Sequence, residues 1–119
     1  MKYLQLELGG EKRGLKFDIG TLKCLHETYN VEPFDFRTEA NKLTEVLPFA
    51  TKIIHSAMLR NCEVKKEPPG FTQQQVEEWV YELDLPVIQD VVTAYNGIFI
   101  RRNPSANGEV GADTQQVIV

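Results

Sequence analysis

The stretch LTEVLPFATKIIHSAM, residues 43–58, decides the fold class of this chain. Its apolar residues recur at steps of three and four, the spacing that places side chains on one buried face of a helix. The residues on this face are Leu43, Val46, Leu47, Ala50, Ile53, Ile54, Ala57 and Met58. No other part of the sequence has so long and regular a pattern, which predicts a helix-rich globular domain organised around one long helix.

Pro48 lies inside this pattern. A proline in a regular helix interior removes one N–H and crowds the carbonyl four residues earlier, at a cost of about 3 kcal/mol. Because the apolar face keeps its phase across Pro48, two alternatives remain: a kink in one helix, or a break with Pro48 in the first turn of a second helix. We expect the helix to begin at Asp35 or Thr38 and to end at Arg60 and Asn61.

The first residues predict a β-hairpin. Leu4, Leu6 and Leu8 alternate with Tyr3, Gln5 and Glu7. This period of two is typical of a strand with one buried face. Two glycines at 9 and 10 then tolerate positive φ, and the alternation resumes on the far side of a loop of either two or four residues. A lone hairpin is marginally stable, so its leucine face must pack on helices or gain a third strand.

Capping residues mark the shorter helices. Asp18 is suited to begin a helix that stops at Asn30. Thr72 and Gln75 have the spacing of a capping box, and apolar residues flank the cap in the staple positions. The buried face of the helix that begins after Thr72 is expected to consist of Val76, Trp79, Val80 and Leu83.

The last predicted helix carries Pro86 in its first turn. Asn96-Gly97 could end it early and leave residues 98–100 as a strand, an alternative that periodicity does not decide. Residues 103–113 are rich in Gly, Asn, Pro and Ser, which is typical of disorder. At the chain end, 117–119 could add a strand to the hairpin of the same or a neighbouring chain, although a frayed terminus is favoured.

The expected architecture is an α+β fold, mostly α-helical, in which an N-terminal β-hairpin packs on four to five helices. Residues 1–101 form a single α+β domain and residues 102–119 a flexible C-terminal tail. The 119 residues, 42% hydrophobic and 25% charged, are enough for one core without disulfides or metals. Because the sequence shows no secretion signal, Cys24 and Cys62 are expected to be reduced and mostly buried rather than joined in a disulfide.

Charge and hydropathy argue against nucleic acid and membranes as partners. A net charge of −4 argues against nucleic acid, because binding a phosphate backbone requires clustered Lys and Arg. No apolar run approaches the ~18 to 20 residues of a membrane span, and the start of the chain does not resemble a signal peptide. We therefore expect a cytoplasmic protein with no membrane or nucleic-acid partner.

The sequence predicts no catalytic, cofactor or metal site. Cys24 and His26 are two residues apart and cannot share a helix face, so they do not form a ligand pair. His55 is expected on the polar flank of the long helix. An enzyme would need a cleft that holds His26 or His55 beside an acid.

Two apolar residues fit the buried face of the long helix poorly. On a helical wheel Phe49 lies at the edge of that face and Leu59 lies opposite it. Isolated exposed apolar residues are normal on protein surfaces. If Phe49 and Leu59 are exposed, they become the candidate partner-binding or self-association residues.

The order of these parts resembles a known family. The segment GGEKRGLKF, residues 9–17, precedes a short helix, and PPGFTQQQVEEW, residues 68–79, follows the long helix and leads to a closing helix and a polar tail. Over residues 4–100 this arrangement is similar to the tail assembly chaperones of tailed bacteriophages and gene-transfer agents.

The resemblance implies a non-enzymatic, cytoplasmic, α-helical protein of the bacterial host cell. Such a protein binds the tape-measure protein, or another phage tail protein, during tail building and is absent from the finished virion. Many members occur also in a frameshifted longer form. The N-terminal hairpin and the polar tail also leave a homo-oligomer open, and a small adaptor or regulatory module of a phage or mobile element is the alternative function.

Overall fold

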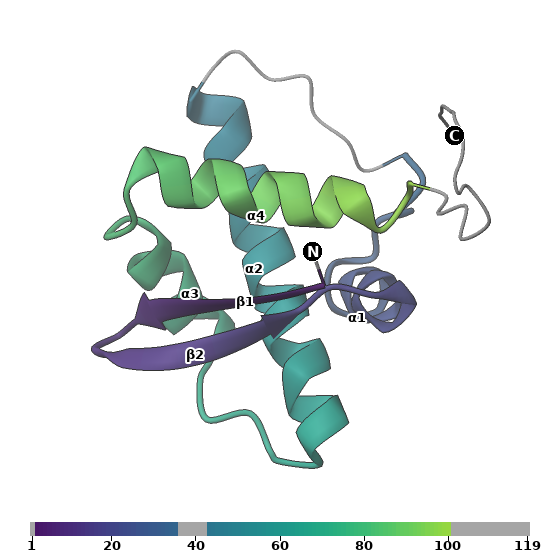
Figure 1. Ribbon diagram of the computed structural model, residues 1–119, viewed down its shortest axis with the longest axis horizontal. Coiled ribbons are helices and arrows are strands. Elements are labelled where there is room, and N and C mark those ends of the chain that lie inside the picture. The colour runs from purple at the N-terminus through teal and green to yellow at the C-terminus, as the bar shows by residue number, and fades with distance from the viewer. Residues whose placement is uncertain (1, 36–42, 101–119) are drawn as a thin grey trace, which may run out of the picture.

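The long apolar pattern forms α2 (Leu43–Lys65), the central helix of the protein. The structure, a computed structural model, describes residues 2–35 and 43–100. Within these residues two strands are followed by four helices, in the order β1 (Tyr3–Leu8), β2 (Glu11–Lys16), α1 (Ile19–Tyr29), α2, α3 (Gln73–Val80) and α4 (Leu85–Gly97). Figure 1 shows the hairpin and α4 both crossing the line of α2. The expected mostly helical α+β class, with an N-terminal hairpin, is confirmed.

The helix α2 runs without interruption through Pro48, so the alternative of a break is wrong. The predicted end at Arg60 and Asn61 is also wrong, because the helix continues to Lys65 and stops where Lys66 has a φ of 58°. Asp35 does not begin the helix but lies in a turn, its N–H donating to the carbonyl of Glu32. The other predicted start, residue 38, lies outside the described residues, as does the predicted tail 102–119.

The hairpin has a two-residue loop. Leu8 pairs with Glu11 in an antiparallel register, which leaves only Gly9 and Gly10 between the strands. Their φ angles of 64° and 83° are the positive values that a primed hairpin turn needs at both positions. The loop length that the sequence left open is thus two.

The leucine face of the hairpin rests on helices, as its marginal stability alone would require. One apolar cluster contains buried residues of both strands and of all four described helices. Its members include Leu8, Leu15, Phe17, Leu25, Ile53, Ile54, Val76, Val80, Val91 and Tyr95.

The predicted caps are present. The Asp18 side chain accepts from the N–H of Thr21 at the start of α1, and Asn30 closes that helix in the left-handed conformation. Thr72 and Gln75 form the expected capping box of α3. The last helix, α4, ends at Gly97, and residues 98–100 form a turn and a bend, so the alternative of a strand there is wrong.

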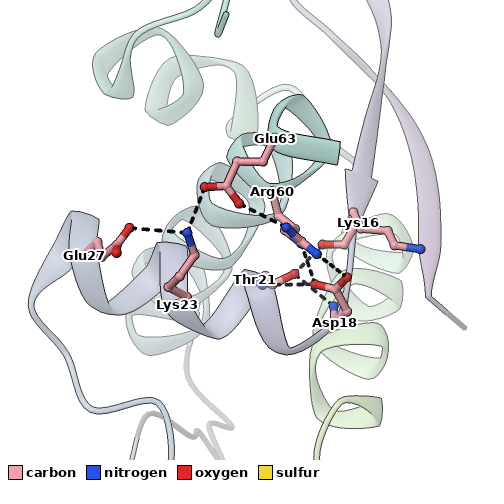
Figure 2. A network of polar contacts seen from close by, with 7 residues as sticks. All are labelled: Lys16, Asp18, Thr21, Lys23, Glu27, Arg60 and Glu63. Carbon is pink, nitrogen blue, oxygen red and sulfur yellow. Dashed lines mark hydrogen bonds and ion pairs between the residues drawn. The ribbon is translucent and has the colours of Figure 1, made fainter. Parts of the chain in front are cut away.

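An ion-pair network fixes α1 against α2 and the end of β2 (Figure 2). Arg60 on α2 donates to both carboxylate oxygens of Asp18, over 2.8 and 3.1 Å. Glu63, one turn further on, accepts from Arg60 and from Lys23 of α1. Thr21 also donates to the carbonyl of Lys16, which ties the first turn of α1 to β2. One cluster of side chains therefore links β2, α1 with its N-cap, and α2.

Candidate functional site

An open groove of about 650 Å³ lies along α2 and α3 and is the candidate binding site. The helix α2 provides one wall and α3 the other, and one residue of α1 contributes to the lining. The lining residues are Tyr29, Leu47, Pro48, Thr51, Lys52, Gln73, Gln74, Glu77, Glu78 and Tyr81. The groove has the size of ligand-binding clefts in general, but it is open along its length rather than enclosed.

The lining combines apolar surface with charges of both signs. Tyr81 follows α3 and is 75% exposed, so a large aromatic ring faces solvent at this site. On the α3 wall Glu77 and Glu78 add two carboxylates, and on the α2 wall the ammonium of Lys52 lies 5.8 Å from the centre of the Tyr29 ring. Aromatic side chains with a polar surround are the composition of protein-binding surfaces.

Tyr29 connects the groove to a buried histidine. Its hydroxyl lies 2.8 Å from Nδ1 of His55, and the two rings pack edge to face at 5.8 Å. On the other side of His55 lies the ring of Phe71, also in an edge-to-face arrangement. The imidazole thus joins α1, α2 and the segment that precedes α3.

The predicted location of His55 on a polar flank is wrong, because the residue is only 6% exposed. The face of α2 that meets Tyr29 and Phe71 also buries its polar residues, and the spacing of apolar residues alone does not reveal this. Burial lowers the pKa of His55 below its ordinary value of 6.5, and the negative charge of Glu77 opposes this only in part.

Tyr29 keeps its proton at neutral pH. Burial, together with the nearby charge of Glu77, raises the pKa of Tyr29 to about 12. A protonated phenol donates to Nδ1 of a neutral His55 when the ring proton is on Nε2 and accepts from Nδ1–H in the other tautomer. Of this pair, Tyr29 lines the groove and His55 does not.

The other residues considered for chemistry are not brought together. His26 is exposed near the end of α1, and its Nδ1 lies 3.0 Å from the carbonyl oxygen of Val31. Both cysteines are free thiols, Cys24 buried and Cys62 half-buried. Burial raises the pKa of the Cys24 thiol to about 11, which favours the unreactive protonated form.

The two predicted partner-binding residues, Phe49 and Leu59, differ in how far they are buried. Phe49 is 5% exposed and packs edge to face on Tyr95 of α4, 5.6 Å away, so it belongs to the core and is not available to a partner. Leu59 is half-buried. A position at the edge of the apolar face of α2 is buried here because α4 covers that edge.

Tyr29 and Tyr81 are the groove residues that the sequence did not identify as partner-binding. Tyr29 packs against the core cluster and also lines the groove. Tyr81 comes directly after Val80, the last residue of the apolar face of α3. An aromatic residue that follows such a face without belonging to it is the feature of the sequence that could have identified Tyr81 as partner-binding.

Among residues 2–35 and 43–100, no three His, Cys, Asp or Glu side chains are placed to hold a metal ion. In the same residues, no helix combines the length and the apolar character needed to cross a bilayer.

Comparison with protein-family models, with curated proteins and with solved structures finds no match for this chain.

Proposed function

We propose that this protein is a non-enzymatic tail assembly chaperone that binds a tape-measure protein, in the cytoplasm of a bacterial host, while a phage tail is built. The resemblance of residues 4–100 to that family supports this function. The observation that carries the proposal is the open groove along α2 and α3, where Tyr29 and the 75% exposed Tyr81 present aromatic surface to solvent.

The groove is suited to a helical client segment. An amphipathic helix binds a groove by inserting apolar residues at helical spacing while its flanks remain in water. Here the tyrosines and Leu47 provide apolar contacts, and Glu77 and Glu78 provide charge on one wall. Tape-measure proteins are long and helix-rich, so segments of this kind recur along them. The preferred segment carries Lys or Arg on the flank that faces α3.

Such binding would keep a client soluble. The apolar face of an unassembled helix promotes association with other copies, and covering that face with the groove prevents it. The chaperone releases the segment when the tail tube or another client copy provides a better partner. This cycle requires no bond to be made or broken.

Co-expression tests the proposal. This chain is produced together with the long, helix-rich reading frame expected just downstream of its gene, and the mixture is analysed by affinity co-purification and light scattering. The proposal predicts that the large protein is soluble and co-purifies only when this chain is present. If the large protein behaves the same with and without the chain, the proposal fails and an adaptor or regulatory module of a mobile element becomes the working function.

A further inference from the structure

The edge of β1 that faces away from β2 carries backbone groups that have no hydrogen-bond partner within the described part of the chain. In the hairpin, Leu8 and Glu11 close the two-residue turn, so every second residue pair exchanges hydrogen bonds between the strands. The N–H of Phe17 donates to the carbonyl of Lys2 over 2.8 Å, in keeping with this alternation. The N–H and C=O groups of Tyr3, Gln5 and Glu7 therefore point outward.

These outward groups make no hydrogen bond with any residue in 2–35 or 43–100. Tyr3, Gln5 and Glu7 are all exposed residues. The two leucines between them, Leu4 and Leu6, are only half-buried although their side chains pack against the core. A backbone edge of this kind must be solvated or paired, because unpaired buried groups are costly.

The opposite edge of the sheet is protected. On β2 the carbonyl of Lys16 accepts from the Thr21 hydroxyl over 2.6 Å. Gly14 faces the side chain of Asn61 on α2, and a Cβ at Gly14 would lie 2.7 Å from the Asn61 amide nitrogen. The other outward position on that edge is Lys12, and lysine is a residue that discourages edge pairing. No proline interrupts Tyr3–Leu8, so β1 lacks that protection.

We propose that β1 pairs antiparallel with β1 of a second copy of this chain, in a register centred on Gln5. In this register Gln5 lies opposite Gln5 of the second copy and Tyr3 lies opposite Glu7, each pair exchanging both backbone hydrogen bonds. On the core side Leu4 meets Leu6 of the other copy, and their exposed portions cover each other.

The sequence of β1 is self-complementary in this register. Like charges are kept apart, since Glu7 meets an uncharged tyrosine. A register moved toward the C-terminal end of β1 would place Glu7 opposite Glu7 and would lose bonds. The resulting dimer has a two-fold axis at Gln5 and a continuous four-stranded sheet. It leaves the groove lined by Tyr81 outside the interface, so it is independent of the proposed client binding.

Cysteine cross-linking tests the register. Gln5→Cys places two thiols across the axis in a hydrogen-bonded pair, whose Cα atoms are about 5.5 Å apart and within reach of a disulfide. Glu7→Cys is the matched control, because in this register the two copies of residue 7 are about 13 Å apart. Under mild oxidation, the Gln5→Cys chain should form a dimer that Glu7→Cys and the wild-type chain, with its two native cysteines, do not. Equal cross-linking of the two variants would overturn the register.

Charge exchange tests the interface in the otherwise native chain. Gln5→Lys and Gln5→Glu each place like charges on the axis, so each alone should weaken self-association by about five-fold, and an equimolar mixture should recover it. Gln89→Lys, an exposed position on α4, makes the same change in net charge and should leave self-association unchanged. The readout is sedimentation equilibrium over a range of concentrations.

Two results would contradict the proposal. A wild-type chain that stays monomeric at every concentration would show that the edge does not pair with a second copy. A Gln5→Lys variant that associates as strongly as Gln89→Lys would place the contact elsewhere. Both measurements use the isolated chain, so neither depends on a client being found.

Discussion

Arg60 on α2 donates two hydrogen bonds to Asp18, one to each carboxylate oxygen, at 2.8 and 3.1 Å. The same carboxylate accepts from the N–H of Thr21 and so caps α1. One side chain therefore sets both where α1 begins and where it lies against α2. Because both partners are partly shielded from water, this pair contributes more than an ordinary surface ion pair.

Asp18→Ala is predicted to lower the free energy of unfolding by about 1–2 kcal/mol, because the cap is lost and Arg60 loses a partner. Asp18→Asn should cost less, since asparagine caps helices about as well as aspartate and its amide oxygen can still accept one of the two bonds from Arg60. Urea unfolding at pH 7 measures both variants. Equal stability of Asp18→Ala and wild type would contradict the linking role of this residue.

The contribution of Asp18 to the free energy of unfolding should depend on pH. Burial alone would raise the pKa of this carboxyl, but hydrogen bonds and charge from Arg60 and the backbone bond from Thr21 hold it below its ordinary value of 3.8. A lowered carboxyl pKa stabilises the fold above that value, and the effect is lost as the pH falls through the folded-state pKa. The stability gap between wild type and Asp18→Asn should thus narrow below about pH 4.

His55 should make the fold less stable in mild acid. Burial lowers its pKa, so below its ordinary value of 6.5 the unfolded chain binds a proton that the folded chain does not. The free energy of unfolding should therefore fall between pH 7 and pH 5. In His55→Leu this slope should be reduced, although the variant is less stable at pH 7 because Tyr29 loses its partner.

His26 provides the control for this measurement. It is exposed on α1, and His26→Gln, measured beside His55→Leu between pH 7 and pH 5, shows what removal of the other histidine does to the slope. The same slope in His55→Leu as in wild type would show that the buried imidazole is not responsible.

The two glycines of the hairpin turn should differ in their tolerance of a side chain. Both have positive φ, so Gly10→Ala should cost about 1 kcal/mol. A Cβ at Gly10 meets open space, whereas a Cβ at Gly9 would overlap the indole of Trp79. Gly9→Ala should therefore cost about 2–4 kcal/mol.

The fluorescence of Trp79 gives a second measurement of the Gly9→Ala substitution. This residue is the one tryptophan of the chain, and the guanidinium of Arg13 lies 4.4 Å from the centre of its ring. Displacement of the indole in Gly9→Ala should shift its fluorescence emission, while Gly10→Ala should leave the spectrum as it is. Identical spectra and stabilities for the two variants would contradict the contact.

Phe49 should behave as a core residue. Phe49→Ala is predicted to lower the free energy of unfolding by about 3–5 kcal/mol, because it removes a ring that packs on Tyr95. Leu59→Ala, at a half-buried position on the same helix, should cost less. Thermal unfolding followed by circular dichroism measures both, and a fully stable Phe49→Ala variant would mean that its ring is not packed as described.

Local signals in the sequence were sufficient for much of the fold. The capping residues Asp18 and Thr72, the αL stop at Asn30 and the Gly9-Gly10 turn act over three or four residues, so a pattern can reveal them. The end of α2 could not be predicted in this way. Arg60 remains helical while paired to Asp18, which is 42 positions away in the sequence.

The candidate site was harder to predict than the fold. A groove arises where α2 and α3 diverge, and no periodicity within either helix encodes the distance between them. His55 and Phe49 were misplaced for a related reason: burial at the margins of α2 depends on Phe71 and α4, which cover those margins. The resemblance in the order of parts suggested a function but no site residues.

The most direct test of the central claim is the affinity of the purified chain for its tape-measure client, measured by titration calorimetry for wild type, Tyr81→Ala and Leu85→Ala. Tyr81 lines the groove, whereas Leu85 is a similarly exposed apolar residue, 52% accessible, that does not. The account predicts that Tyr81→Ala weakens binding by about ten-fold or more, as loss of an aromatic anchor does, and that Leu85→Ala binds like wild type. Equal affinity of all three chains, or no binding by the wild type, would contradict it.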